Sequence, residues 1–111
     1  MAGKIDRRQV LNPSSMSLQK DIEARFTQAM KAKDAEALSV FRMLRASLKN
    51  AEIEKRTSEL ADEEVIDVVS REIKKIKDSL EDFEKAGRSE LADKARKEIE
   101  TVSEFLPEQG W

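Results

Sequence analysis

The sequence has 111 residues, of which 40% are charged, 39% hydrophobic and 5% aromatic, and its formal net charge is −2. This length allows one domain, and the nearly balanced charge with ample apolar content is typical of a folded chain. Three Gly and two Pro are too few for the turns of an all-β domain. The chain contains no Cys and no His, which excludes thiolate nucleophiles, imidazole bases and most transition-metal sites. We therefore expect no catalytic residue, no cofactor and no metal site.

The first fifteen residues differ from the rest of the chain. Residues 1–15 show no sustained helical period and end in Asn-Pro-Ser-Ser, a cluster that breaks regular structure. One interpretation is a frayed tail; the other, which we favour, is a disordered N-terminal extension before a natural start at Met16. A highly charged chain without Cys is typical of the cytoplasm, which is the location we expect.

Two amphipathic helices are predicted next. Apolar residues at steps of three and four predict a helix over about 17–33. Asp34 can cap the start of a second helix, which should extend over about 34–56. The expected inner line of this second helix consists of Ala37, Phe41, Leu44, Leu48 and Ala51.

Two further helices follow a connector without periodicity. Asp62 is the expected cap of a third helix over 62–86, and Gly87 should end it in the position after the C-cap. Ser89 is the expected cap of a fourth helix over 89–106. The expected inner face of the third helix consists of Ile66, Val69, Ile73, Ile76, Leu80 and Phe83.

These patterns together predict an all-α fold, an elongated bundle of four amphipathic helices. The second and third helices both carry seams close to the coiled-coil period, so we expect them to form a long antiparallel hairpin. No stretch approaches the 18 apolar residues of a membrane span, so we expect no contact with a membrane.

The charged faces allow two interpretations. On the third and fourth helices, acids precede bases by four residues, as in Glu81 and Lys85, which is typical of a solvated helix surface. The second helix instead carries a one-sided basic row formed by Arg42, Arg45, Lys49 and Arg56. This row could lie along an RNA backbone, or it could be an ordinary basic face that pairs with acids on the third or fourth helix. All four Phe fall on inner lines, which leaves no aromatic platform for stacked bases.

Four blocks of the sequence resemble the GatB/YqeY family in order and spacing, over about residues 16–109. The blocks are LSVFRMLRASLKNAEIEKR (38–56), LADEEVIDVVSREIKK (60–75), SLEDFEKAGRSELADKARKEIE (79–100) and EFLPEQ (104–109). Members are small bacterial proteins with mitochondrial relatives, and they resemble the tail of the B subunit of the tRNA-dependent amidotransferase. The family usually has Thr or Ser where this chain has Ala61.

The resemblance implies an N-terminal all-helical domain with a long hairpin, here 16–109. The family normally continues into a C-terminal three-helix domain, which we expect to be absent because the sequence stops at Gly110-Trp111. A truncated chain, a frameshifted gene or a naturally short member would each give this ending.

The family label is a carbon–nitrogen ligase activity with glutamine as amide donor. We ascribe this label to the parent complex, because the chain shows no phosphate-binding loop and no nucleophile–base pair. The resemblance thus favours a non-catalytic module associated with tRNA or with the amidotransferase machinery. The alternative is a protein-interaction or scaffold domain without RNA binding, which could self-associate through its helix seams.

Overall fold

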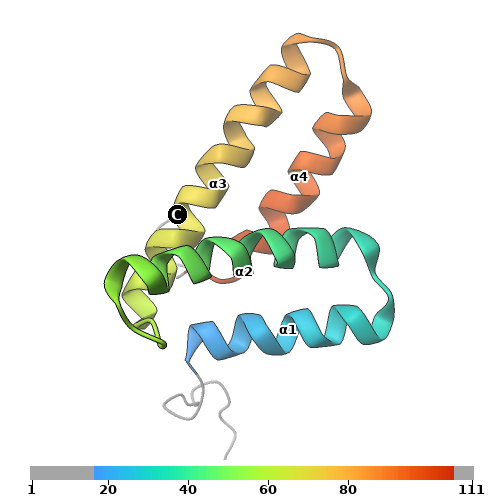
Figure 1. Cartoon of the computed structure of the whole chain (residues 1–111). Coiled ribbons are helices and arrows are strands. Elements are labelled where there is room, and N and C mark those ends of the chain that lie inside the picture. The colour runs from blue at the N-terminus through green and yellow to red at the C-terminus, as the bar shows by residue number, and fades with distance from the viewer. Residues whose placement is uncertain (1–16, 107–111) are drawn as a thin grey trace, which may run out of the picture.

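A computed structural model describes residues 17–106 of the chain, and within that range the fold is all-α (Figure 1). The expected number and order of helices are confirmed. The helices are α1 (Leu18–Ala32), α2 (Ala35–Lys55), α3 (Asp62–Lys85) and α4 (Ser89–Ser103). None of them is long and apolar enough to cross a bilayer. The extension predicted for residues 1–15 lies outside the described residues.

Several helix ends follow the sequence signals. The side chain of Asp34 accepts a hydrogen bond from the backbone N–H of Ala37 at 3.1 Å and thus caps α2 as expected. Gly87 lies just beyond α3 with φ of 71°, a left-handed conformation that favours glycine. The N–H of Arg88 bonds to the carbonyl of Phe83 at 2.8 Å, which completes a Schellman motif.

Two expected caps are wrong. Ala61 occupies the N-cap of α3, and the Glu64 carboxylate satisfies its backbone N–H at 2.9 Å. Asp62 is therefore free to accept a tertiary hydrogen bond from the N–H of Leu18 at 2.9 Å. At the start of α4, Arg88 is the N-cap residue and Ser89 is already helical, with no side-chain capping bond.

The helices form two hairpins that cross one another (Figure 1). α1 runs alongside α2, and α3 runs alongside α4, while α2 lies across the lower part of the α3–α4 hairpin. The expectation that α2 and α3 form the long hairpin is therefore wrong, because the long antiparallel partner of α3 is α4. The turn at Gly87 is tight, whereas residues 56–61 between α2 and α3 are long enough to let the chain change direction. The Cα radius of gyration is 15.4 Å, above the ~13 Å of a compact 100-residue domain, in accord with the expected elongated shape.

One apolar core fills the region where the two hairpins cross. Val40, Phe41, Leu44 and Leu48 of α2 are buried against α3 and the end of α4. Phe105, just after α4, meets Phe41 edge to face with ring centroids 6.0 Å apart. The buried stripe of α3 is wider than the expected seam, because it also contains Val65 and Val68. α3 thus contacts α2 and α4 at once, which a narrow seam could not do.

A buried carboxylate lies at the crossing of α2 and α3. Glu72 is the one polar residue of the described range that is buried, with 4% of its surface exposed. Its Oε2 accepts hydrogen bonds from Ser47 Oγ at 2.8 Å and from Lys75 Nζ at 3.0 Å. Because a buried charge is unfavourable without partners, this contact fixes where α2 can rest on α3.

Gln19 joins the start of α1 to the α2–α3 connector. Its side-chain oxygen accepts the N–H of Leu60 at 2.8 Å, and its amide nitrogen donates to Glu52 on α2. Leu60 itself is buried, with 2% of its surface exposed. The connector, which the sequence pattern leaves without regular structure, is therefore anchored to the core.

Gly87→Ala should destabilise the protein by about 1 kcal/mol, because a Cβ disfavours the left-handed backbone at this turn. No heavy atom lies within 4 Å of the position that this Cβ would occupy, so the loss is conformational, not steric. Chemical denaturation measures it. Gly87→Asn is the control and should lose less stability, since Asn tolerates this conformation; equal stability of all three proteins would contradict the assignment.

A double-mutant cycle on Ser47→Ala and Glu72→Met, which removes the acceptor at similar volume, should show coupling of about 1.5 kcal/mol, the value of a hydrogen bond to a charged group. Denaturant unfolding of the four proteins measures it. The exposed pair Arg96 and Glu84 on α4 and α3 is the comparison, and its coupling should stay below about 1 kcal/mol. A coupling near zero at Ser47 and Glu72 would show that their contact does not hold the crossing.

Candidate nucleic-acid interface

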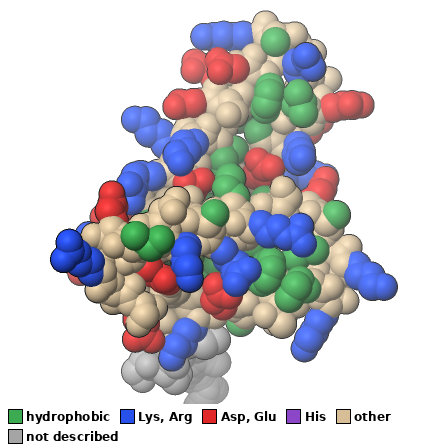
Figure 2. Space-filling view, viewed as in Figure 1, with side chains coloured by type: hydrophobic (Ala, Val, Ile, Leu, Met, Phe, Trp, Pro, Cys, Tyr) green, Lys and Arg blue, Asp and Glu red, His purple; other side chains and the backbone are tan. Residues whose placement is uncertain are grey.

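The basic row predicted on the second helix lies along the edge of α2 that faces α1. Arg42 and Lys49 are exposed and two helical turns apart, and each lines a shallow hollow between the two helices. Neither makes an ion pair with any residue in the range 17–106. Figure 2 shows basic side chains spread over α1 and α2 on one face, with acidic side chains between them. These two cations are therefore available to an anionic partner.

Arg45 is held differently from its neighbours. Its Nε lies 3.0 Å from the Glu23 carboxylate of α1, and its guanidinium stacks over the Phe26 ring at 4.3 Å from the centroid. A cation held by an acid and an aromatic ring has little freedom to turn toward a new partner. Arg45 is thus paired with an acid, but this acid comes from α1 and not from the third or fourth helix.

Arg56 is the C-cap of α2 and has a left-handed backbone with φ of 57°. The N–H of Thr57 bonds to the carbonyl of Glu52 at 3.0 Å, which closes the helix end. The side chain of Arg56 is exposed and makes no ion pair with a described residue. Arg56 thus extends the basic row past the last turn of α2, and its left-handed backbone sets the direction of its side chain.

Acidic residues reduce the net charge of the hollow between α1 and α2. Glu23 and Glu52 line it together with the basic row. Glu23 is already engaged by Arg45, and Glu52 accepts a hydrogen bond from Gln19. The hollow therefore has a weak positive excess that comes from Arg42 and Lys49.

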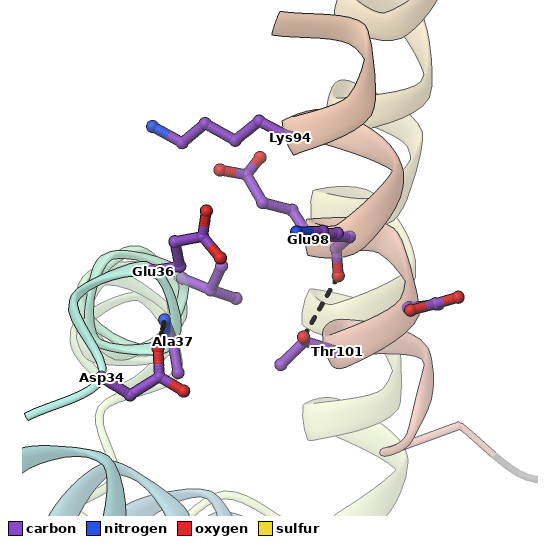
Figure 3. A pocket seen from close by; sticks show the side chains of 9 residues that line it. Asp34, Glu36, Ala37, Lys94, Glu98 and Thr101 are labelled. Carbon is purple, nitrogen blue, oxygen red and sulfur yellow. Dashed lines mark hydrogen bonds between the residues drawn. The ribbon is translucent and has the colours of Figure 1, made fainter. Parts of the chain in front are cut away.

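A second hollow of about 240 Å³ separates the start of α2 from α4 (Figure 3). The carboxylates of Glu36 and Glu98 point into it from opposite sides, and Lys94 extends above them. Thr101 is occupied with its own helix, since its hydroxyl donates to the Lys97 carbonyl at 3.1 Å. Among residues 17–106 no group of three or more His, Cys, Asp or Glu side chains could hold a metal ion. The mixed charges suit a solvated cleft between helices.

A third hollow, of about 300 Å³, lies between α2 and α3 on the other edge of α2. Its lining includes Asn50 from α2 and Arg71 from α3, both exposed. Neither Asn50 nor Arg71 is among the site residues that the sequence predicts. Nothing in the helical period of either segment shows that α2 crosses α3 here.

Some charges of α3 and α4 pair with one another across or along the hairpin. Arg96 bridges Glu84 of α3 and Asp93 of its own helix, and Glu81 lies 4.0 Å from Lys85. The interpretation of these faces as solvated surfaces agrees with such exposed pairs, which contribute little energy each.

Comparison with known protein families shows to which family the chain belongs. A family model described as Yqey-like protein matches residues 19–110. The chain belongs to the YqeY-like family. The first three of the blocks that resemble this family in sequence, over residues 38–100, lie on α2, α3 and α4.

Several fungal proteins are similar to this YqeY-like chain. Altered inheritance of mitochondria protein 41, mitochondrial, of Lachancea thermotolerans is 34% identical over 84% of the chain and 48% of its own length. Its namesake in Candida glabrata is 30% identical over 83% of the chain and 49% of its own length. An uncharacterised Schizosaccharomyces pombe protein is 30% identical over 85% of the chain and 76% of its own length. The chain thus spans about half the length of the two mitochondrial relatives.

The names of these relatives overturn the expected cytoplasmic location. The prediction is wrong because both the Lachancea and the Candida proteins are named as mitochondrial. The composition could not reveal this, since low Cys content indicates a reducing compartment without saying which one.

Arg45→Gln should lower the free energy of unfolding by about 1 kcal/mol, because it removes the stacking on Phe26 and the contact with Glu23. Arg42→Gln is the matched control and should change it by less than about 0.5 kcal/mol, as expected of a surface residue without partners. Denaturant unfolding measures both. If the two substitutions cost the same, Arg45 has no structural role beyond that of Arg42.

Proposed function

We propose that this YqeY-like domain is a non-catalytic RNA-associated module that binds tRNA through the basic row of α2. The observation that carries the proposal is the exposure of Arg42 and Lys49 along one edge of α2, without ion-pair partners among residues 17–106. Arg56 continues the same edge. Phosphate contacts of this kind give affinity without sequence readout, so binding should be weak and strongly dependent on salt.

We expect the basic row to attract RNA phosphates less strongly than four free cations would. Arg45 contributes little, because Glu23 neutralises it and Phe26 fixes its orientation. We therefore assign the phosphate contacts to Arg42, Lys49 and Arg56, with Arg45 as the residue that holds α1 against α2.

In this proposal the ligase reaction is carried out by a partner complex and not by the domain itself. Ser47, Glu72 and Lys75 bring a hydroxyl, a carboxylate and an amine together, and we assign this contact to the packing of α2 on α3 because Glu72 is buried there. We propose that the domain presents or positions tRNA for a tRNA-dependent amidotransferase, and that the ligase chemistry resides in that complex. Because two relatives are named as mitochondrial, mitochondrial tRNA is the pool to test first.

The alternative is a protein-interaction or scaffold domain that pairs with another protein or with itself. The large hydrophobic side chains exposed among residues 17–106 are Met30, Ile53 and Leu91. They come from three different helices, whereas a protein interface usually presents one contiguous apolar patch. This distribution favours RNA over a protein partner.

Arg42→Gln with Lys49→Gln should weaken tRNA binding at least tenfold at low salt. The slope of log affinity against log salt should fall by about 1.4–1.8, the loss of two phosphate contacts. Fluorescence anisotropy with labelled tRNA at several salt concentrations measures both quantities.

The matched control is Lys77→Gln with Lys85→Gln, which removes equal charge from α3 and should leave affinity and slope nearly unchanged. A protein that binds no tRNA at low salt, or a control that weakens binding as much as the α2 variant, would contradict the proposal. A persistent dimer by sedimentation without tRNA binding would instead establish the scaffold alternative.

A further inference from the structure

The hollow between α2 and α3 offers both hydrogen-bond donors and acceptors. Ser47, Asn50 and Glu54 line it from α2, and Arg71, Glu72 and Lys75 line it from α3. Its volume of about 300 Å³ lies at the lower end of the range of small-molecule sites.

The charges of this lining cancel. Arg71 and Lys75 supply two positive charges, and Glu54 and Glu72 supply two negative ones. Glu72 and Lys75 are moreover paired with each other at 3.0 Å. A hollow with no net charge does not favour a free phosphate or a simple cation; it suits a neutral group that carries donors and acceptors on its edge.

Three side chains of the lining are free to make new contacts. Asn50 and Arg71 are exposed and make no side-chain hydrogen bond or ion pair with another residue of the described range. Ile53 has 69% of its surface exposed, the largest fraction among the big hydrophobic residues described. An amide, a guanidinium plane and an aliphatic surface therefore meet at one hollow.

The hollow lies next to the basic row, on the other side of the exposed ridge of α2. Lys49 belongs to the row and Asn50 to the hollow, and consecutive residues point about 100° apart around a helix. Ala46 and Ile53 lie between them on the ridge, and Ala46 is exposed and small. A nucleotide with its phosphate on Lys49 can thus place its base across the ridge at Ala46.

We propose that the α2–α3 hollow receives an unstacked adenine or cytosine, in which the exocyclic amino group lies beside a ring-nitrogen acceptor on the Watson–Crick edge, where guanine has an N–H donor. This inference rests on the proposed function, because the basic row supplies the phosphate contacts. The Asn50 amide pairs with the base edge, as Asn does with adenine, and Glu54 accepts a hydrogen bond from the amino group. Arg71 stacks on the base face in place of the missing aromatic platform, and Ile53 covers its rim.

Three labelled RNA dodecamers of adenosine, cytidine or uridine test the proposal with the whole chain. The adenosine and cytidine oligomers should bind about tenfold more tightly than the uridine oligomer, the scale of one well-made base contact. In Asn50→Leu this difference should fall below about twofold, while the salt slope stays unchanged because no phosphate contact is lost. Leu favours helix, so α2 should persist, as circular dichroism can verify.

Gln28→Leu, an exposed amide on α1 away from the hollow, is the matched control and should keep the preference. Equal binding of the three oligomers, or a preference that survives Asn50→Leu, would overturn the base site and leave the proposed function standing. A uniform loss of affinity for all three oligomers in Asn50→Leu would overturn it in the same way. Failure of every oligomer and of tRNA to bind would overturn both proposals.

Discussion

The crossing of α2 over the α3–α4 hairpin is the constraint on which the other features depend. α2 buries one stripe against α3 and the end of α4, and one of its edges adjoins α1. Phe41 meets Phe105 in the apolar part of the crossing, and Ser47 meets the buried Glu72 in its polar part. Apolar contacts tolerate sliding, whereas a buried carboxylate that needs its donors fixes the register.

This crossing also creates the two edges of α2 that carry the proposed function. One edge faces α1 and holds Arg42 and Lys49, and the other overlooks α3 and holds Asn50. Had α2 and α3 formed a long hairpin, the second edge would have been covered along its length. The same geometry explains why Arg45 differs from its neighbours, since it alone lies within reach of Glu23 and Phe26.

The helices could be predicted from the sequence, but their pairing could not. Apolar spacing and the residues Asp34 and Gly87 indicate where helices begin and end, because these are local effects of the backbone. Periodicity shows which face of a helix is buried and not which helix covers it. Val65 and Val68 widen the stripe of α3 enough for two partners, and the expected seam omitted both. Glu72 follows the same spacing as Val69 and Ile76, which was a usable sign that an acid lies in the core.

In the candidate site, too, the residues on a single helix could be predicted, whereas the contacts between helices could not. The basic row was visible because Arg42, Arg45, Lys49 and Arg56 share one side of a single helix. That Arg45 is engaged by α1 depends on a tertiary contact, so the helical period alone cannot separate it from Arg42. The proposed base site draws on two helices, because Asn50 of α2 and Arg71 of α3 line one hollow at the crossing.

The central claim is that RNA lies along α2 and touches both of its edges. Mapping amide and side-chain NMR shifts during titration with the adenosine dodecamer tests this claim most directly. We expect the largest changes at Arg42, Lys49 and Asn50 on α2 and at Arg71 on α3, and little change at the Gly87 turn. Changes confined to α4 and that turn, or no changes at saturating RNA, would contradict the account.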